Sequence, residues 1–240
     1  TVVAGTRSAG NGIDAVLDMH QDIFGRGFGY AGAPLWACDE AQYAAFTPME
    51  PWFMNYFSAQ VEACFDALWI DRTLWDEYRD AWAHAAAALA DHPAVVGFDL
   101  FNEPFPGSTP TATFEREVLP AFHAHVAAAF TGPAAAKRVF VEPAVTYDFS
   151  PTTRLPPFAA GEGFAPHYYP TFVESGIYAG REEDVAADLL DMAGDAAHLG
   201  DPLFLGEFGI SNTAPGATPY LSDMIDGVLA LGGSAAPWDF

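Results

Sequence analysis

The sequence contains six short apolar runs, and each of them ends in polar or acidic side chains. Continuous runs of this kind are typical of strands that are buried on both faces of a parallel sheet. Stretches with apolar residues at helical spacing lie between them, so predicted strands and helices alternate, which indicates repeated βαβ units. The predicted strands cover residues 13–19, 95–101, 138–141, 163–166, 202–206 and 232–237, and the predicted helices cover residues 75–89, 114–130, 185–199 and 220–231.

The polar clusters all follow the carboxyl ends of the predicted strands, where a (β/α)₈ TIM barrel builds its active site. A doubly wound sheet also binds ligands at that edge, but it usually has a glycine-rich turn after its first strand. Here that turn is His20-Gln21-Asp22, without a Gly-x-Gly-x-x-Gly motif. We therefore expect an α/β chain with the barrel fold. No linker divides it, so we predict one catalytic domain over residues 1–240.

One interval departs from the regular alternation. About 80 residues separate His20 from Asn102, and they include an insertion at about residues 23–74 that is rich in Gly, Pro and aromatic residues. Both cysteines of the chain, Cys38 and Cys64, lie in this insertion. They could form one disulfide or remain two free thiols, and the sequence leaves both possibilities open.

Composition excludes several classes of function. The chain has 9 Lys and Arg against 32 Asp and Glu, a formal net charge of −23, which argues against binding to nucleic acid or to anionic lipid. No apolar run approaches the about 20 residues of a membrane span. The chain begins at Thr1 without a start Met or a signal peptide, so we expect it to be part of a longer protein.

Two glutamates are the candidate catalytic residues. Glu103 and Glu207 each follow or end a predicted strand, and they would meet at the mouth of a barrel. A pair of carboxyl groups at this place is typical of glycoside cleavage, in which one protonates the leaving oxygen and the other attacks the anomeric carbon or activates water. Asn102, next to Glu103, could bind the 2-hydroxyl group of the sugar.

His20, Asp22, His167 and Tyr169 are candidate substrate-binding residues. Each pair has alternate positions, so both side chains of a pair lie on one face of an extended segment. Two His with Asp and Glu could also bind zinc, but the ligand set is sparse and we expect no metal. Trp238 is the candidate platform for a sugar ring. We interpret Glu142, also at a strand end, as a rim residue or a residue that supports the site.

The sequence resembles glycoside hydrolase family 5, a retaining family of (β/α)₈ barrels. Phe101-Asn102-Glu103-Pro104 resembles the acid/base strand end of that family, and Gly206-Glu207-Phe208-Gly209 resembles its nucleophile strand end. Within the family the chain is similar to the endoglycoceramidases. That likeness is carried by the stretches that begin at Leu17 (Leu-Asp-Met-His-Gln-Asp), Gly32 (Gly-Ala-Pro-Leu-Trp-Ala) and Pro166 (Pro-His-Tyr-Tyr).

The resemblance implies roles for the candidate residues. Glu103 would be the acid/base and Glu207 the nucleophile, and Tyr169 would donate a hydrogen bond to Glu207. The sugar next to the scissile bond would be bound by His20, Asp22, Asn102, His167, Tyr169 and Trp238. The insertion would help to form an apolar groove for ceramide.

The resemblance also implies the reaction and the organisation of the chain. The reaction would be hydrolysis of the bond between a glycan and ceramide, without a cofactor or an obligate protein partner, in a secreted or cell-surface protein. Two barrel strands and the C-terminal sandwich domain of endoglycoceramidases are not found, so the third to eighth βα units of an incomplete barrel are expected.

Several alternatives remain at this point. The enzyme could be a glucosylceramidase, a steryl-β-glucosidase or an endo-β-galactosylceramidase, or a family 5 endo-β-glucanase or mannanase that acts on an oligosaccharide. It could also be a non-catalytic relative that binds carbohydrate or lipid. The sequence does not indicate the glycan length, the lipid specificity or the oligomeric state.

Overall fold

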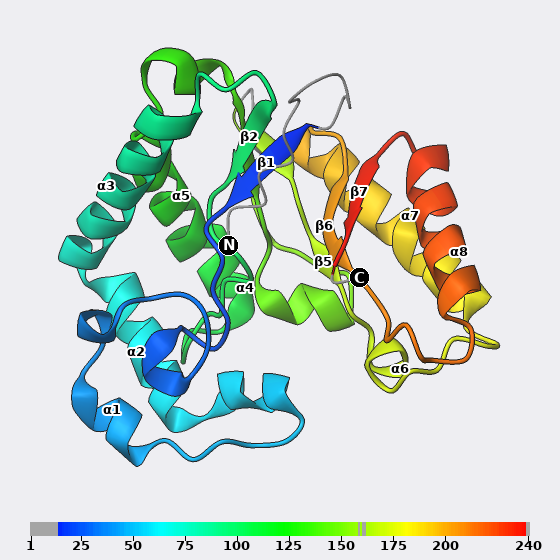
Figure 1. The fold of residues 1–240 in the computed structure, drawn as a ribbon, viewed down its shortest axis with the longest axis horizontal. Helices are drawn as coiled ribbons and strands as arrows, with labels where there is room; N and C mark the ends of the chain where they lie inside the picture. Colours follow the sequence, from blue (N-terminus) through cyan, green and yellow to red (C-terminus); the bar gives the residue numbers. More distant parts are fainter. Residues whose placement is uncertain (1–13, 158, 160–161, 239–240) are drawn as a thin grey trace. The chain divides into compact units, whose positions relative to one another are not determined.

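A computed structural model describes residues 14–157, 159 and 162–238 of the chain (Figure 1). The chain divides into two compact units, Thr1–Phe140 and Val141–Phe240, which are treated one after the other. Thr1, the first residue of the chain, and Ile13, the first residue of a predicted strand, lie outside the described residues. Within the described part of the chain, no helix combines the length and the apolar character needed to cross a membrane.

The first unit is built around three parallel strands. β1 (Ala15–Asp18) and β3 (Arg138–Val141) pair with β2 (Val95–Asp99), which lies between them, and β3 reaches one residue past the end of the unit. Phe98 of β2 is fully buried. Because the strands are parallel, the segments that follow β1 and β2 leave the sheet at the same edge, as the sequence predicted.

The helices of the first unit pack beside this sheet. α3 (Arg72–Leu89) begins after Asp71, whose side chain accepts a hydrogen bond from the backbone of Thr73, and it buries Trp75 and Trp82. The single helix expected at 114–130 is interrupted. It consists of α4 (Thr111–Thr113), the π-helical turn η5 (Phe114–Val118) and α5 (Leu119–Ala127), followed by η6 (Gly132–Ala136). α3 and α5 lie side by side (Figure 1).

The insertion contains more helix than its composition predicted. Ser58 caps α2 (Ala59–Ile70) by accepting a hydrogen bond from the N–H of Val61. A disulfide between Cys38 and Cys64 joins the start of the insertion to α2, which decides a pairing that the sequence left open. The other elements of the insertion are η2 (Arg26–Phe28), η3 (Leu35–Ala37), α1 (Glu40–Ala45) and η4 (Trp52–Phe57).

The second unit contains a parallel sheet of β5 (His167–Tyr168), β6 (Phe204–Phe208) and β7 (Ser234–Pro237), with β6 in the middle. Another short strand, β4 (Glu162–Phe164), precedes β5 but belongs to the sheet of β3. The sequence predicted one strand here. It is divided at Pro166, which has no N–H to donate and whose carbonyl accepts from the backbone of Gly206.

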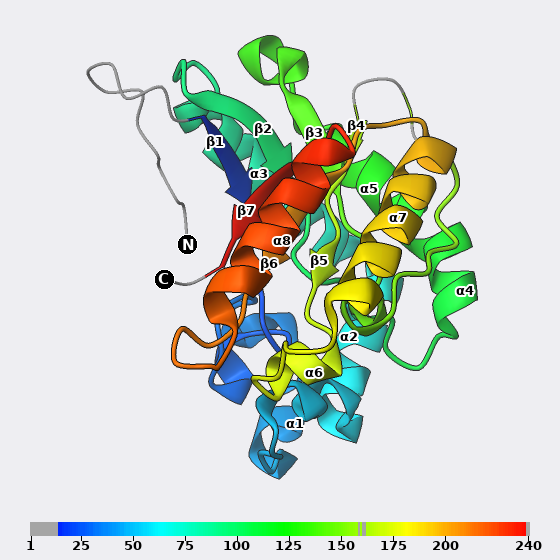
Figure 2. The ribbon, with the colours of Figure 1, turned by 90° about the vertical axis from the view of Figure 1, so that its right-hand side faces the viewer.

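Two long helices, α7 (Glu182–Leu199) and α8 (Ala217–Ala230), lie side by side next to this sheet (Figure 2). Gly227 permits the close approach, because a Cβ atom there would lie 2.5 Å from a methyl carbon of Leu189. α7 ends at Gly200 in the left-handed conformation, a common helix stop. The shorter elements of the unit are η7 (Val145–Phe149) and α6 (Thr171–Glu174).

Candidate active site

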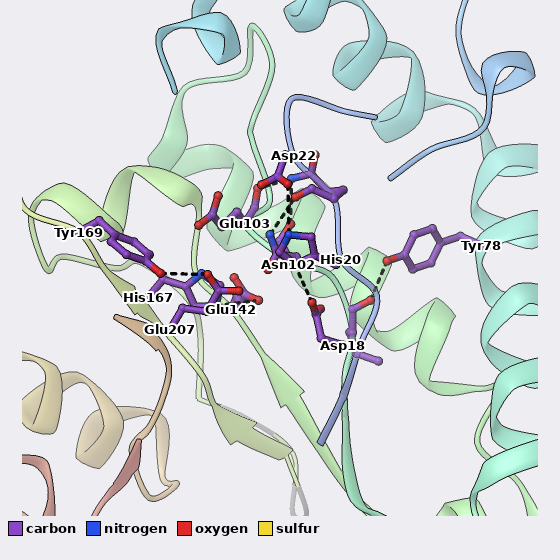
Figure 3. A network of polar contacts seen from close by, with 12 residues as sticks. Asp18, His20, Asp22, Tyr78, Asn102, Glu103, Glu142, His167, Tyr169 and Glu207 are labelled. Atoms are coloured by element: carbon purple, nitrogen blue, oxygen red, sulfur yellow. Dashed lines mark hydrogen bonds and ion pairs between the residues drawn. The ribbon is translucent and has the colours of Figure 1, made fainter. Parts of the chain in front are cut away.

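The residues that follow β1 form a linear ion-pair cluster. The ring of His20 lies between two carboxylates, with Nδ1 at 2.9 Å from Asp18 and Nε2 at 3.2 Å from Asp22 (Figure 3). The three residues are at alternate positions, which places their side chains on one face of the segment. The structure therefore brings the predicted pair His20 and Asp22 together and adds Asp18.

Both nitrogens of the His20 ring are engaged in this cluster. Burial by itself lowers the pKa of His20, but the hydrogen bonds and charges of Asp18 and Asp22 outweigh it and raise the pKa from 6.5 to about 10. His20 is therefore an imidazolium at neutral pH and donates in both directions. The ring of His20 thus fixes the carboxylate of Asp22, whose role in binding substrate stays a prediction.

Glu103 lies directly after β2, and its side chain is 7% exposed. One carboxylate oxygen, Oε2, accepts a hydrogen bond from the hydroxyl of Tyr56 at 3.3 Å. Its backbone has a positive φ of 44°, which is uncommon for a residue with a side chain. Its neighbour Asn102 is also buried, and the side-chain amide of Asn102 donates to the carbonyl oxygen of Gln21 at 2.8 Å.

Glu207 occupies β6 in the second unit, and its side chain is 12% exposed. The hydroxyl of Tyr169 donates to Oε2 of Glu207 at 3.3 Å, which confirms the predicted hydrogen bond (Figure 3). Nδ1 of His167 lies 3.6 Å from the same oxygen, and Nε2 of His167 lies 3.4 Å from Glu142. Glu142 is almost fully buried, so it supports His167 and is not a rim residue.

The glycine before Glu207 has a packing role in this arrangement. A Cβ atom at Gly206 would lie 3.1 Å from two atoms of the His167 ring. Because β5 and β6 pair in parallel with His167 opposite Glu207, a larger residue at 206 would displace the ring from the carboxylate. The position of the His167 ring thus explains why a glycine precedes Glu207 in the Gly206-Glu207-Phe208-Gly209 motif.

A hollow of about 520 Å³ lies in the second unit, within the range of about 300–1,000 Å³ typical of small-molecule sites, and Tyr169, the hydrogen-bond partner of Glu207, is part of its wall. The predicted substrate-binding residues Tyr169 and Trp238 both line it, and Trp238 is partly exposed. Sequence reasoning missed its polar residues, which lie on the loop after β6 and on α6. They are Glu174, Ser211 and Asn212.

A smaller cavity of about 200 Å³ lies in the first unit. Its walls come from the segment after β1, from the insertion and from α3, and most of them are apolar. The lining residues include Met19, Phe24, Pro34, Trp36, Leu68 and Tyr78. Its volume is below the about 300 Å³ of an ordinary ligand site.

The structure also reveals residues of the first unit that the sequence did not single out. Gln21 and Tyr56 contact Glu103 directly, although Gln21 lies between two predicted residues and Tyr56 is in the insertion. Glu103 belongs to the first unit and Glu207 to the second, so the distance between their carboxyl groups stays a prediction.

Comparison with known proteins identifies the family. Residues 6–240 match the model of the cellulase family, glycosyl hydrolase family 5. The chain belongs to glycosyl hydrolase family 5. The fold of this family is the (β/α)₈ barrel, as the sequence predicted, and the parallel strands of both units agree with it.

Within family 5 the chain is similar to endoglycoceramidases. It is 27% identical to endoglycoceramidase I of Rhodococcus hoagii (strain 103S) over 223 residues, which cover 82% of this chain and 44% of that protein. The structure of endo-glycoceramidase II from Rhodococcus sp. superposes with a TM-score of 0.82 at 27% identity, covering 94% of this chain and 56% of that one. An endogalactoceramidase structure gives a TM-score of 0.79 at 25% identity, covering 95% and 54%. The chain thus spans about half the length of these relatives.

Proposed function

We propose that the protein is a retaining β-glycosidase that hydrolyses the bond between a glycan and ceramide. The observation that carries the proposal is the pair of supported glutamates in a family 5 chain. Glu103 is buried and hydrogen-bonded to Tyr56, whereas Glu207 is more exposed and receives its hydrogen bond from Tyr169. Different surroundings of this kind allow one carboxyl group to act as an acid while the other stays ionised.

In the proposed mechanism Glu207 attacks the anomeric carbon while Glu103 gives its proton to the ceramide oxygen, so that the glycosidic C–O bond breaks as the glycosyl–enzyme ester forms. Glu103 then takes a proton from water, and the resulting hydroxide displaces Glu207 from the sugar. Structures of endo-glycoceramidase II from Rhodococcus sp. include a lactosyl–enzyme intermediate and a ganglioside GM3 complex, which support this course by similarity.

The choice of ceramide as the leaving group is supported by the insertion. It exposes large apolar side chains within one short stretch of sequence, and the aliphatic ones among them suit the apolar chains of ceramide. Trp36 is 63% exposed and Leu35 is 62% exposed. The other members of this apolar surface are Trp52, Met54 and Phe57.

The nearest alternative is an endo-β-galactosylceramidase, which the similarity to the endogalactoceramidase structure favours. Glucosylceramidase, steryl-β-glucosidase and family 5 glucanase or mannanase activities differ from it in sugar or aglycone. A side-by-side assay with glucosylceramide, galactosylceramide-series lipids, a ganglioside, steryl glucoside and a β-glucan separates them. We expect release of an intact oligosaccharide from the ganglioside.

We further propose that the protein functions in an oxidising compartment, as a secreted or cell-surface enzyme of lipid metabolism. The disulfide between Cys38 and Cys64 supports this, because disulfides persist outside the reducing cytosol. We expect no cofactor, and the test is that a chelator leaves the rate unchanged.

Variants of the two glutamates test the catalytic assignment in the intact protein. Glu103→Ala and Glu207→Ala should each reduce glycolipid hydrolysis by a factor of about 10³ or more. Glu117→Ala and Glu183→Ala remove exposed glutamates from the first and second units and serve as matched controls. Wild-type rates in either catalytic variant would reject the assignment. A carboxyl separation above about 6.5 Å in a crystal structure would reject the retaining mechanism.

A further inference from the structure

The side chain of Gln21 connects the segments that follow β1 and β2. Its amide nitrogen lies within hydrogen-bond distance of three acceptors, the carbonyl oxygens of Asn102 at 2.9 Å and Glu103 at 3.0 Å and the Tyr56 hydroxyl at 3.1 Å, so its two N–H groups are shared among them. Its own oxygen accepts from the backbone of Phe24 at 2.9 Å. Gln21 is only 5% exposed, and all these groups belong to the first unit. The amide of Gln21 therefore holds the segment after β1 to the segment after β2, and we call this set of hydrogen bonds the clamp.

This clamp acts on an unusual backbone conformation. Glu103 has a φ of 44°, in the left-handed region that side chains with a Cβ atom avoid. Pro104 follows it, and a residue before proline is disfavoured in the right-handed helical region. The hydrogen bond from Gln21 to the Glu103 carbonyl thus stabilises the conformation that aims the carboxyl group.

Tyr56 makes the second connection to Glu103. Its hydroxyl accepts from Gln21 and donates to Oε2 of Glu103. The ring is buried and stacks on Phe105 with a centroid distance of 5.4 Å. Burial raises the pKa of Tyr56 well above its ordinary value, and the charges of Glu103 and Asp22 raise it further. Hydrogen bonds from the backbone of Ile23 and from the amide of Gln21 lower it, but they do not outweigh the other effects. The phenol therefore remains protonated, and a hydrogen-bond donor, at neutral pH.

We propose that Gln21 and Tyr56 are positioning residues for the acid/base, Gln21 through the backbone of Glu103 and Tyr56 through one carboxylate oxygen. The inference rests on the proposed role of Glu103. Neither residue exchanges a proton in the reaction: the proton moves from the Glu103 carboxyl group to the leaving oxygen as the C–O bond breaks. The two residues restrict where that proton is presented.

The test compares leaving groups in the intact protein. Two substrates with the same glycan are used, a ceramide glycoside, whose alkoxide leaves poorly, and a 4-nitrophenyl glycoside, which needs little protonation. Tyr56→Phe deletes one hydroxyl. Tyr178→Phe is the matched control, because its hydroxyl donates to the carboxylate of Asp223, and neither residue belongs to the candidate site.

We expect Tyr56→Phe to lower kcat/KM about 10- to 100-fold for the ceramide glycoside and less than about threefold for the 4-nitrophenyl glycoside, because kcat/KM reports the glycosylation step and only the ceramide oxygen needs a proton in that step. Its KM for the ceramide glycoside should stay near the wild-type value, and Tyr178→Phe should behave as wild type on both substrates. Gln21→Met keeps the side-chain length without the donor and should show the same selective loss. It also provides the test if Tyr56→Phe does not fold.

Equal losses on the two substrates, or no loss, would overturn the positioning role. The result is interpreted together with Glu103→Ala. If that variant loses the ceramide activity while Tyr56→Phe and Gln21→Met match the control, only the positioning role fails. If Glu103→Ala keeps the ceramide activity, the proposed function itself fails.

Discussion

The free energy of unfolding should depend on pH between pH 7 and pH 9 because of His20. Its pKa is raised from 6.5 to about 10 in the folded chain, so between these values the folded state binds a proton that the unfolded state has lost. Stability from this group is therefore fully present below pH 6.5 and is lost as the pH rises toward 10. By proton linkage, its contribution falls by about 2–3 kcal/mol between pH 7, where it is about 4 kcal/mol, and pH 9.

The measurement is the free energy of unfolding from urea titrations at pH 7, 8 and 9, for the wild type and for His20→Gln. Subtraction cancels the groups that the two proteins share, and the difference should shrink by about 2–3 kcal/mol between pH 7 and pH 9. His84→Gln, which changes an exposed histidine on α3, is the control and should show a constant difference.

The pH window is chosen from the other shifted groups. Burial lowers the pKa of His123 to about 3, so that residue affects stability only below about pH 6.5. Burial raises the pKa of Tyr56, whose effect begins above its ordinary value of 10. A wild-type-to-His20→Gln difference that does not change between pH 7 and pH 9 would refute the charged state of His20 and, with it, the ion-pair cluster of Asp18 and Asp22.

Three further predictions concern the disulfide, the apolar surface and a buried histidine. Replacing Cys38 and Cys64 by Ala opens a loop with a sequence separation of 26 and should lower the free energy of unfolding by about 3.5 kcal/mol, measured by urea denaturation. Trp36→Ser should raise KM about tenfold for ceramide glycosides in micelles and leave KM for a 4-nitrophenyl glycoside unchanged. His123→Leu should gain about 2 kcal/mol relative to wild type between pH 7 and pH 5, because only the unfolded wild type takes up the proton, as thermal or urea unfolding would show.

Each of these predictions has a contrary result. Two reactive thiols in the unreduced, denatured protein would contradict the disulfide. Equal KM changes on both substrates would assign Trp36 to the fold and not to lipid binding. A pH-independent effect of His123→Leu would mean that His123 is accessible to protons in the folded chain.

Local pattern was sufficient for much of the fold. The apolar run around Phe98 predicted β2, and the polar residues at strand ends predicted the places of Glu103 and Glu207. This succeeds because burial on both faces of a parallel strand imposes a continuous apolar run. The family resemblance implied the hydrogen bond from Tyr169 to Glu207, and the structure contains it.

Other elements depended on partners that local pattern does not reveal. Local pattern does not reveal α2, because the Gly, Pro and aromatic residues of the insertion do not indicate a helix. The helix depends on the Ser58 cap and on packing around Cys64. His123 of α5 is buried, with its ring next to that of Phe122, although nothing in the local pattern of the helix marks it as a core residue.

The sequence by itself determined the strand order along the chain, the strand-end glutamates and the family. Only the tertiary structure decided that His20 is clamped between Asp18 and Asp22, that Cys38 pairs with Cys64, and that Gln21 and Tyr56 hold Glu103. The reason is physical. Periodicity and burial are properties of neighbouring residues, but the surroundings of a carboxyl group are set by side chains that come together only when distant segments leave the same edge of a sheet.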